Sequence, residues 1–317
     1  LHCKSMAHLY CIVQKFQPNI IHSHLFHSNM YGRIISLFTS ARNISTVHSL
    51  IEDGRFRPPF YRFTDRLCYK TVFVSNASRN LYLQNKASVE ERSCVINNGL
   101  DFNRKNINSK RLNELRLNYA INPNDFVWLA IGRLVQSKDY PLLIESFSIF
   151  HQRNNNAKLL IVGDGKCYDI IKDIINAKYL IKSVIIINPT SEIDLFYSIS
   201  DAYISTSKYE SFGLTLIEAI IYNLPVLSTS SGGSDEILSN GKFGYLAENR
   251  NASFIAALMF QISKMPSEEK EVFVRNAYQY AKQSYNIDKT ISEWNKLYSG
   301  LIDNNKLLKS WDRSNNA

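Results

Sequence analysis

The segment Val127–Asp139 reads VWLAIGRLVQSKD, a short apolar run that stops at a glycine and continues in polar and basic residues. Such a run is typical of a buried parallel strand, and the helix-like pattern of Tyr140–Gln152 follows it. In sheets built from strand–loop–helix units, ligands bind at the carboxyl ends of the strands. Arg133 and Lys138 are therefore expected at a binding edge, where they could hold a diphosphate. The alternative is two cations on a solvated loop.

The alternation of short apolar runs with helix-like runs extends along the whole chain. The predicted strands are Asn19–His24, Ser45–Ser49, Thr71–Ser75, Cys94–Asn97, Val127–Ile131, Leu159–Val162, Ser183–Ile187, Ala202–Ser205 and Val226–Ser228. The predicted helices include Asn29–Leu37, Tyr140–Gln152, Tyr168–Ala177, Ile193–Ser198 and Thr215–Tyr222. This order predicts an α/β protein with doubly wound parallel sheets.

The length of the chain, 317 residues, suits two domains. The polar segment Arg104–Asn124 separates two sets of strands, so we predict one Rossmann-like domain over residues 1–110 and a second over 111–282. Residues 283–317 are expected to form a C-terminal helix, which packs back on the first domain, and a polar tail. The second domain shows about five strands and looks complete. The first shows four and is expected to be incomplete.

The composition describes a globular protein, with 45% hydrophobic and 21% charged residues. No apolar run reaches the roughly 18 residues that a membrane-spanning helix needs, and the N-terminus lacks the pattern of a signal segment. The five cysteines are scattered, with no C-x-x-C pair. These features predict a cytoplasmic chain without disulfides and without a zinc site.

The basic excess of the chain belongs to its first third. Residues 1–110 hold 15 Lys and Arg against 6 Asp and Glu, whereas residues 111–317 hold 22 of each sign. The imbalance predicts an anionic partner for the first domain: a membrane surface with a lipid-phosphate acceptor, or a charged polysaccharide. Nucleic acid is not favoured, because no zinc-finger, basic-zipper or RNA-recognition pattern occurs. The stretch Arg55–Phe63 interleaves Arg with aromatic residues, which suits a lipid headgroup interface or, equally, a solvated loop leading into a helix.

A second motif, Glu210–Ala219, reads ESFGLTLIEA and places Glu210 eight positions before Glu218. A helix that starts between Phe212 and Leu214 would direct its free N–H groups and its positive dipole toward the ligand of the loop. This arrangement would make an anion site beside a carboxylate. Chance spacing of two glutamates is the simpler alternative.

Two glycine-containing loops also follow predicted strands. Val162–Gly165 reads VGDG and Ser230–Glu236 reads SSGGSDE. Glycines of this kind allow the backbone to approach a ligand, or simply make a tight turn. Each loop is a weak signal when taken alone.

Taken together, these segments resemble the retaining glycosyltransferases of family 4, which have the GT-B fold of two Rossmann-like domains facing a cleft. The segments that match are Asn19–His24 (NIIHSH), Thr46–Ser49 (TVHS), Val95–Asp101 (VINNGLD), Gly132–Lys138, Val162–Gly165, Glu210–Glu218, Leu224–Val226 (LPV) and Gly232–Glu236. The resemblance covers nearly all of the chain. The family's opening βαβ units normally precede the first of these strands, so the resemblance implies a chain that is truncated at its N-terminus.

The resemblance assigns the second domain to the nucleotide-sugar donor and the first domain to the acceptor. Arg133 and Lys138 would hold the donor diphosphate, Glu218 the ribose hydroxyls and Glu210 the hydroxyls of the donor sugar. His48 would line the cleft near the transferred sugar, so the catalytic set would be Glu210, His48, Arg133 and Lys138. The donor-binding set would be Arg133, Lys138, Gly163, Glu210, Ser211, Phe212, Gly213, Leu214 and Glu218.

The resemblance further implies hexosyl transfer with retention to a glycan or lipid-linked glycan in surface polysaccharide biosynthesis, such as capsule or lipopolysaccharide. No cofactor and no metal are expected, and the protein would be cytoplasmic, with peripheral attachment to the inner membrane face. His22, His24 and His27 lie close together in sequence, but a structural role is favoured over a metal site. A catalytically dead nucleotide-binding remnant and a sugar-nucleotide 2-epimerase of the same fold are the alternatives.

Overall fold

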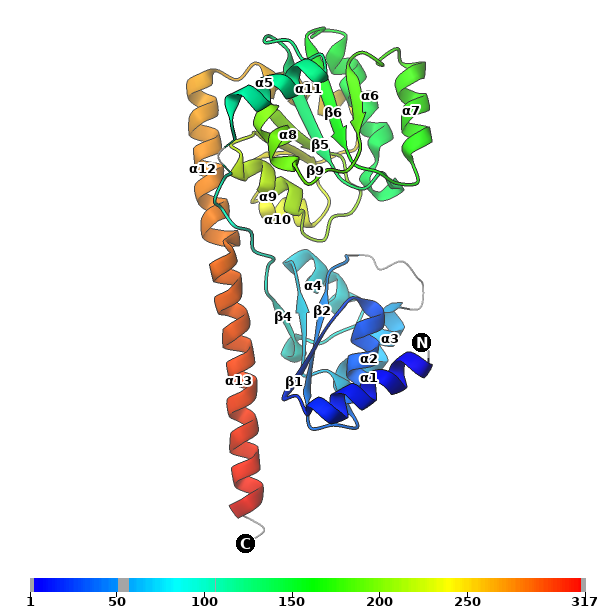
Figure 1. The fold of residues 1–317 in the computed structure, drawn as a ribbon, viewed down its shortest axis with the longest axis vertical. Helices are drawn as coiled ribbons and strands as arrows, with labels where there is room; N and C mark the ends of the chain where they lie inside the picture. Colours follow the sequence, from blue (N-terminus) through cyan, green and yellow to red (C-terminus); the bar gives the residue numbers. More distant parts are fainter. Residues whose placement is uncertain (1–2, 51–56, 106, 315–317) are drawn as a thin grey trace. The chain divides into compact units, whose positions relative to one another are not determined.

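The structure is a computed structural model that describes residues 3–50, 57–105 and 107–314 (Figure 1). The chain forms two compact units. Unit 1 comprises Leu1–Gly99 with Ile287–Ala317, and unit 2 comprises Leu100–Asn286. Each is built around one parallel β-sheet, so the predicted α/β fold with two Rossmann-like domains is confirmed.

Unit 1 contains a sheet of four parallel strands in the order β1-β2-β3-β4. The strands are β1 (Ile20–His24), β2 (Arg42–Val47), β3 (Lys70–Phe73) and β4 (Ser93–Val95). The helices are α1 (Cys3–Phe16), α2 (Phe26–Ser36), α3 (Arg57–Thr64), α4 (Asn76–Gln84) and α13 (Ile287–Ser314), with short 3-10 turns η1 (Asp65–Leu67) and η2 (Glu90–Arg92). The central strands β2 and β3 are almost wholly buried, which explains their continuous apolar and small-polar sequences.

Unit 2 contains a sheet of six parallel strands in the order β10-β9-β8-β5-β6-β7. The strands are β5 (Phe126–Ile131), β6 (Ala157–Val162), β7 (Val184–Ile187), β8 (Ala202–Ser205), β9 (Val226–Thr229) and β10 (Tyr245–Ala247). The connecting elements are α5 (Ser109–Asn118), η3 (Gln136–Lys138), α6 (Tyr140–His151), α7 (Tyr168–Ala177), α8 (Ile193–Ile199), α9 (Leu214–Ile221), α10 (Gly233–Ile237), α11 (Ala252–Ser263) and α12 (Ser267–Tyr285). The strand order reverses between β5 and β8, and this is where ligands bind in open α/β sheets.

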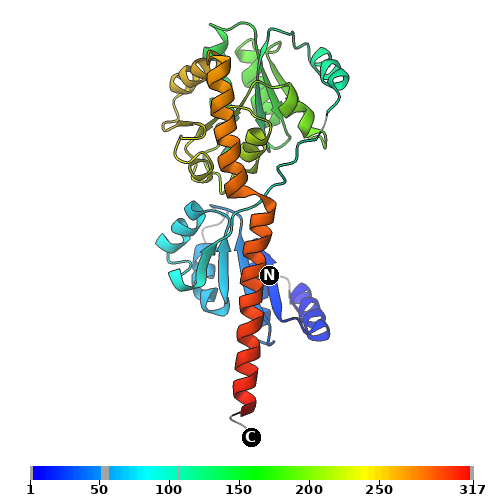
Figure 2. The ribbon, with the colours of Figure 1, turned by 90° about the vertical axis from the view of Figure 1, so that its left-hand side faces the viewer.

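The long terminal helix α13 packs along the sheet of unit 1 (Figures 1 and 2). Its Leu301 joins a buried cluster with Ile44 and Val72, and Leu297 packs against the same cluster. Thr290 Oγ1 donates a hydrogen bond of 3.1 Å to the Asn97 carbonyl. The last segment of the chain therefore completes the core of the first unit.

Several boundaries differ from the sequence prediction. The chain passes from unit 1 to unit 2 after Gly99, so the predicted boundary at residue 110 falls inside helix α5. This helix buries none of its residues, and for that reason its polar sequence resembles a linker. The chain returns to unit 1 after Asn286 rather than residue 282, because Tyr285 at the end of α12 is still buried.

The second sheet has six strands rather than about five. The additional strand is β10, which is only three residues long and lies at the edge of the sheet. So short an apolar run gives little periodicity to detect. Arg55 and Phe56, which open the predicted aromatic–arginine stretch, lie outside the described residues. Within the described ranges, no helix combines the length and apolar composition that a bilayer crossing requires.

Candidate functional site

The loops that follow β5 and β8 meet at one edge of unit 2. Lys138 ends the turn η3 after β5, and its Nζ lies 2.5 Å from Glu210 Oε2 on the loop after β8. The Lys208 N–H donates a hydrogen bond of 2.7 Å to the Ser137 carbonyl. Thr206 Oγ1 donates to the Lys138 carbonyl at 3.0 Å. The predicted cation and the predicted carboxylate are thus held together at the carboxyl ends of two adjacent strands.

Arg250, on the loop after β10, binds the same two loops through hydrogen bonds. The sequence analysis did not identify this residue. Its guanidinium donates to the Thr206 carbonyl at 2.8 Å and the Ser207 carbonyl at 3.0 Å. It also lies 2.5 Å from Asp139 Oδ2. Arg250 follows β10, the strand whose sequence was too short to recognise, so no signal placed it near the site.

The segment between Glu210 and helix α9 is held by backbone contacts. The Glu210 N–H donates to the Ser231 carbonyl at 2.9 Å, and the Gly233 N–H donates to the Glu210 carbonyl at 2.7 Å. Gly213 precedes α9 with φ of +99°, a conformation that favours glycine. The N-cap residue of α9 is Gly213, which has no side chain to cap the helix. The first backbone N–H groups and the positive dipole end of α9 therefore lie next to the loop of Glu210.

The side chains of this segment divide between core and surface. Phe212 is buried and packs edge-on against Tyr285, so its side chain belongs to the core and only its backbone can face a ligand. Leu214 is 42% exposed. Gly233 allows the close packing here, because a Cβ at this position would lie 2.6 Å from Phe212 N. Ser211 is half-buried.

Glu218 is held in the middle of α9 by a buried tyrosine. Tyr197 Oη donates a hydrogen bond of 2.7 Å to Glu218 Oε2. Burial raises the pKa of Tyr197 well above its ordinary value, and the charges of Tyr203 and Glu218 raise it further. Tyr197 therefore stays protonated and remains a donor. Among the residues that the structure describes, the second carboxyl oxygen of Glu218 has no hydrogen-bond partner, so it can accept other hydrogen bonds.

The glycine-rich loop before α10 forms a turn that is closed by its own carboxylate. Asp235 Oδ2 accepts hydrogen bonds from the N–H groups of Ser231 and Gly232, at 2.9 and 2.8 Å. Burial alone would raise the pKa of Asp235, but the hydrogen bond from Ser230 and those from the two N–H groups lower it overall. These N–H groups are already satisfied, so of the two expected roles of this loop the structure shows the turn.

Of two further predicted donor-binding residues, Gly163 is closely packed and Arg133 is exposed to solvent. A Cβ at Gly163 would lie 2.0 Å from the Gly132 carbonyl oxygen, so a glycine is required for the loops after β5 and β6 to touch. Arg133 is exposed, and its guanidinium makes no hydrogen bond or ion pair with the residues that the structure describes. It remains available to an anion at this edge.

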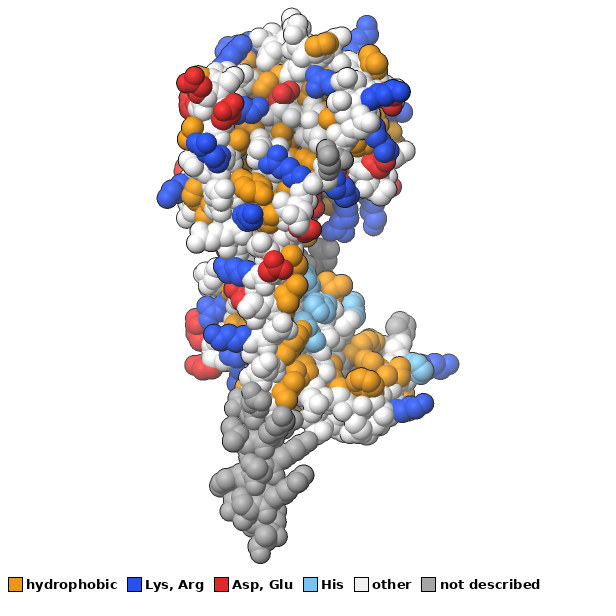
Figure 3. Space-filling view, turned by 60° about the vertical axis from the view of Figure 1, so that its left-hand side comes forward, with side chains coloured by type: hydrophobic (Ala, Val, Ile, Leu, Met, Phe, Trp, Pro, Cys, Tyr) orange, Lys and Arg blue, Asp and Glu red, His pale blue; other side chains and the backbone are white. Residues whose placement is uncertain are grey.

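Three histidines pack ring to ring in unit 1: His22 in the middle of β1, His24 at its end and His48 just after β2. Figure 3 shows His side chains gathered on this unit. His24 ends β1 and shares a hydrogen bond of 2.9 Å with His48, which follows β2. His22 contacts Tyr298 Oη at 2.6 Å and Thr46 Oγ1 at 2.7 Å. Both ring nitrogens of His22 therefore have partners inside unit 1, consistent with the structural role predicted for it.

These histidines are held in the neutral form. Burial lowers the pKa of His22 to about 4, and the neighbouring His24 and His48 lower it as well. Burial also lowers the pKa of His24 and of His48. Neutral imidazoles can each accept and donate one hydrogen bond. The edge where β1 and β2 end is therefore suited to hydroxyl groups rather than to anions.

Two parallel-sheet units of this kind, one of which carries a cation–carboxylate loop edge at its strand ends, define a protein of the GT-B fold class. The chain belongs to the family described as "Glycosyl transferases group 1", which matches residues 113–280. Residues 2–104 match the family described as "Glycosyltransferase Family 4".

Known proteins agree with this assignment. "Alpha-monoglucosyldiacylglycerol synthase" of Acholeplasma laidlawii is 26% identical over 68% of this chain and 54% of its own length. The crystal structure of a glycosyltransferase from Rickettsia africae superposes with a TM-score of 0.85 at 22% identity, over 95% of this chain and 81% of that one. The Anabaena protein HepE in complex with UDP-glucose superposes with a TM-score of 0.83 at 20% identity, over 93% and 82% of the two chains.

The chain matches only part of the length of these curated relatives. Two further relatives are covered over 65% and 51% of their lengths. The chain thus spans between about half and two thirds of these relatives.

Proposed function

We propose that this protein transfers a hexose, with retention, from a nucleotide-diphospho-sugar to a glycan or lipid-linked glycan. The observation that carries the proposal is the Lys138–Glu210 pair, which the structure holds at the strand ends beside the start of α9. A cation, a carboxylate and a helix N-terminus together match the chemistry of a sugar joined to a diphosphate. HepE, which shares the fold, has been crystallised with UDP-glucose.

In the proposed reaction, Lys138 and Arg133 bind the diphosphate. The acceptor hydroxyl attacks the anomeric carbon on the face from which the nucleoside diphosphate leaves. The new C–O bond forms as the bond to the phosphate oxygen breaks, and the departing phosphate takes the hydroxyl proton. Negative charge builds on the leaving group in this step, so fixed cations at the site lower the barrier. We propose that these side chains supply that charge without a metal or cofactor.

The carboxylates bind hydroxyl groups rather than form a covalent bond. Glu210 would accept from the donor sugar, with its position fixed by Lys138 and by two backbone hydrogen bonds. Glu218 would accept from the ribose through the oxygen that Tyr197 leaves free. Gly163, Ser211 and the backbone N–H groups of residues 212–214 complete the donor-binding set of this proposal.

His48 serves the acceptor side of the proposal. It is half-buried, its pKa is lowered by burial, and His24 fixes one of its ring nitrogens. A neutral ring in this state can orient an acceptor or donor-sugar hydroxyl without attracting the anionic leaving group. The A. laidlawii relative is named for a product that contains diacylglycerol. We propose a lipid-linked acceptor of surface polysaccharide biosynthesis and a cytoplasmic protein attached peripherally to the membrane.

The stereochemistry of the product tests the proposed reaction. The protein would be incubated with a panel of α-linked UDP-, GDP- and ADP-sugars, and the sugar released to acceptor or water followed by proton NMR. The first-formed product should carry the α configuration, and Lys138→Ala should slow its formation about 10²–10³-fold. A β product would overturn retention. A change at C2 without release of nucleotide would support an epimerase instead.

A further inference from the structure

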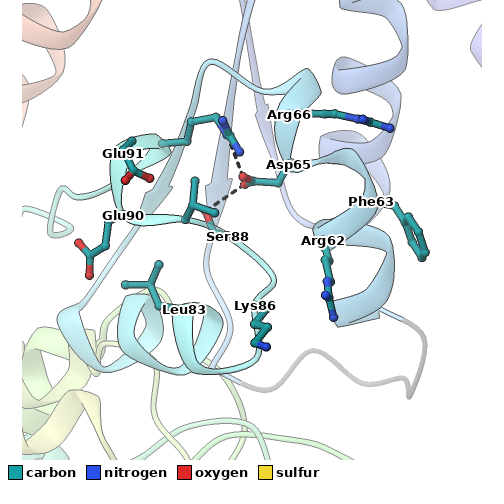
Figure 4. Close-up of a pocket in the computed structure, with 11 residues that line it drawn as sticks. Arg62, Phe63, Asp65, Arg66, Leu83, Lys86, Ser88, Glu90 and Glu91 are labelled. Atoms are coloured by element: carbon teal, nitrogen blue, oxygen red, sulfur yellow. Dashed lines mark hydrogen bonds and ion pairs between the residues drawn. The ribbon is translucent and has the colours of Figure 1, made fainter.

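Unit 1 has an open hollow of about 730 Å³ between α3, the end of α4 and the turn η2 (Figure 4). Arg62, Arg66 and Lys86 are exposed side chains at its border, and we call them the basic rim. They make no hydrogen bond or ion pair with the part of the chain that the structure describes. The hollow is separate from the histidine edge, because none of its lining residues is a histidine.

Two of the three acidic residues of the hollow already have partners in unit 1. Asp65 is 4% exposed and accepts hydrogen bonds from Ser88 Oγ at 3.0 Å and from Arg92 Nε at 2.9 Å. Glu90 is paired with Arg79. Among the lining residues, Glu91 remains as an acidic group against the three cations of the basic rim. The hollow therefore presents excess positive charge to an incoming ligand.

Helix α3 adds exposed aromatic rings beside this charge. Phe60 and Phe63 are 50% and 76% exposed, and they lie on one side of the helix at a spacing of three. Phe63 lies at the border of the hollow, on the outer side of α3 in Figure 4. Tyr61, between them, is fully buried and anchors α3 to the core. A short helix that anchors one ring and exposes two, next to arginines, has the pattern of a membrane-interface element.

We propose that the hollow binds the phosphate of an anionic phospholipid headgroup, with Phe60 and Phe63 in the acyl boundary beside it. This inference rests on the proposed function, in which the acceptor lies at a membrane. Arg62 and Lys86 flank the hollow in Figure 4 and offer charge to a phosphate, with Arg66 at its border. Residues 1–99, which make up most of unit 1, hold 12 Lys and Arg against 5 Asp and Glu, and this excess draws the unit to an anionic surface. A soluble polyanion would use the charge but not the exposed rings, and for this reason the lipid is favoured.

The test is co-sedimentation of the full chain with vesicles. The protein should bind vesicles that contain phosphatidylglycerol, and bind phosphatidylcholine vesicles at least about tenfold more weakly. The triple variant Arg62→Gln, Arg66→Gln, Lys86→Gln should reduce binding by about tenfold or more, because each basic residue near such a surface contributes several-fold. The double variant Phe60→Ser, Phe63→Ser should also weaken vesicle binding. All of these side chains except Phe60 line the hollow, and all are exposed, so the variants should keep the parent unfolding temperature.

A matched control removes the same charge elsewhere. Lys172→Gln, Lys182→Gln and Arg275→Gln change three exposed cations of unit 2. This variant should bind vesicles like the parent. Equal loss in the two triple variants would mean that net charge acts without a site, and would overturn the proposal.

Two further arms separate the sources of an anion. Inorganic phosphate should compete only weakly with vesicles; full displacement by phosphate would indicate a free-phosphate site and overturn the lipid assignment. If Phe60→Ser, Phe63→Ser keeps both its dextran sulfate binding and its vesicle binding at the parent level, the hollow is a polyanion site. That result would overturn the lipid assignment. Binding of UDP, GDP and ADP is measured on the parent and on the same variants. Vesicle binding that fails while one of these nucleotides still binds would reject this inference alone, whereas a parent that binds none of the three would reject the proposed function.

Discussion

The two units present the same kind of sheet edge but opposite chemistry. In unit 2 the loops at the strand ends carry ionised groups, with Lys138 paired to Glu210 and Arg250 paired to Asp139. In unit 1 the corresponding edge carries His24 and His48, whose pKa values burial lowers. One edge is therefore charged and the other neutral at physiological pH.

The difference matches the proposed division of a transfer reaction between two surfaces. Fixed cations are useful where a diphosphate must be bound and then stabilised as a leaving group. Neutral hydrogen-bonding groups are useful where a hydroxyl must be oriented without competing for that anion. The predictions below test this division, from the largest expected effect to the smallest.

Removing the cation of the charged edge should have the largest effect. Lys138→Ala should lower kcat about 10²–10³-fold, because the lysine would act on charge that develops in the transition state. The value of KM should change much less. Steady-state kinetics with the preferred sugar nucleotide measures both. Lys172→Ala, on an exposed face of α7, is the control. Turnover that survives Lys138→Ala would remove the diphosphate role.

Removing the carboxylate of Glu218, which we propose binds the ribose hydroxyls, should weaken nucleotide binding. Glu218→Ala should weaken nucleotide affinity by about 1.5–3 kcal/mol, the contribution of a hydrogen bond to a charged group. Isothermal titration calorimetry measures it. Tyr197→Phe keeps the carboxylate but removes its 2.7 Å donor, and it should cost less affinity. Glu271→Ala, on the exposed face of α12, should be neutral; a loss there as large as in Glu218→Ala would show a non-specific charge effect.

The charged edge also depends on close backbone contact. Gly163→Ala places a Cβ 2.0 Å from the Gly132 carbonyl, so the loops must separate. We expect a loss of about 1–3 kcal/mol in the free energy of unfolding, together with weaker nucleotide binding. Chemical denaturation gives the first quantity. In Gly300→Ala nothing lies within 4 Å of the new Cβ, so this helical position should tolerate alanine or gain stability.

The neutral edge should make unit 1 sensitive to acid. The folded pKa of His22 is about 4 and its ordinary value is 6.5, so the unfolded chain binds more protons between these values. Stability should therefore be complete above about pH 6.5 and fall as the pH falls toward 4. Because the ring is only partly buried, we expect about 1 kcal/mol, or about 2–4 °C in Tm.

Calorimetric scans across this pH range measure the effect. His22→Gln removes the titrating group and should flatten the dependence. A profile that stays as steep in this variant would assign the acid sensitivity to other groups.

Much of this architecture could be predicted from the sequence. The strand β5 was readable because its apolar run ends at Gly132, and Lys138 was correctly placed on the loop that follows this strand. The ion pair of Lys138 with Glu210 was not predicted, because it joins loops whose paired residues lie 72 positions apart in sequence. The short motifs alone were ambiguous, and their order along the chain resolved them. The match over residues 113–280 confirms the glycosyltransferase family, group 1, while retention stays a prediction.

Other features could not be predicted because their signals are not local. Strand β10 is too short to show a period, and Arg250 reaches the site only through long-range contacts. Helix α5 was missed because it buries no residue. The glycine-rich loop before α10 suggested a phosphate site, but its backbone N–H groups donate to the carboxylate of Asp235 instead. These hydrogen bonds cannot be read from the sequence.

Hydrogen–deuterium exchange with nucleoside diphosphates tests the central claim most directly. The full chain would be compared with and without saturating UDP, GDP and ADP. We predict that one of them slows exchange in peptides covering residues 132–139 and 210–218, and leaves residues 20–48 unchanged. Protection confined to residues 20–48, or no protection with any of the three, would contradict the assignment of the charged edge to the nucleotide-sugar donor.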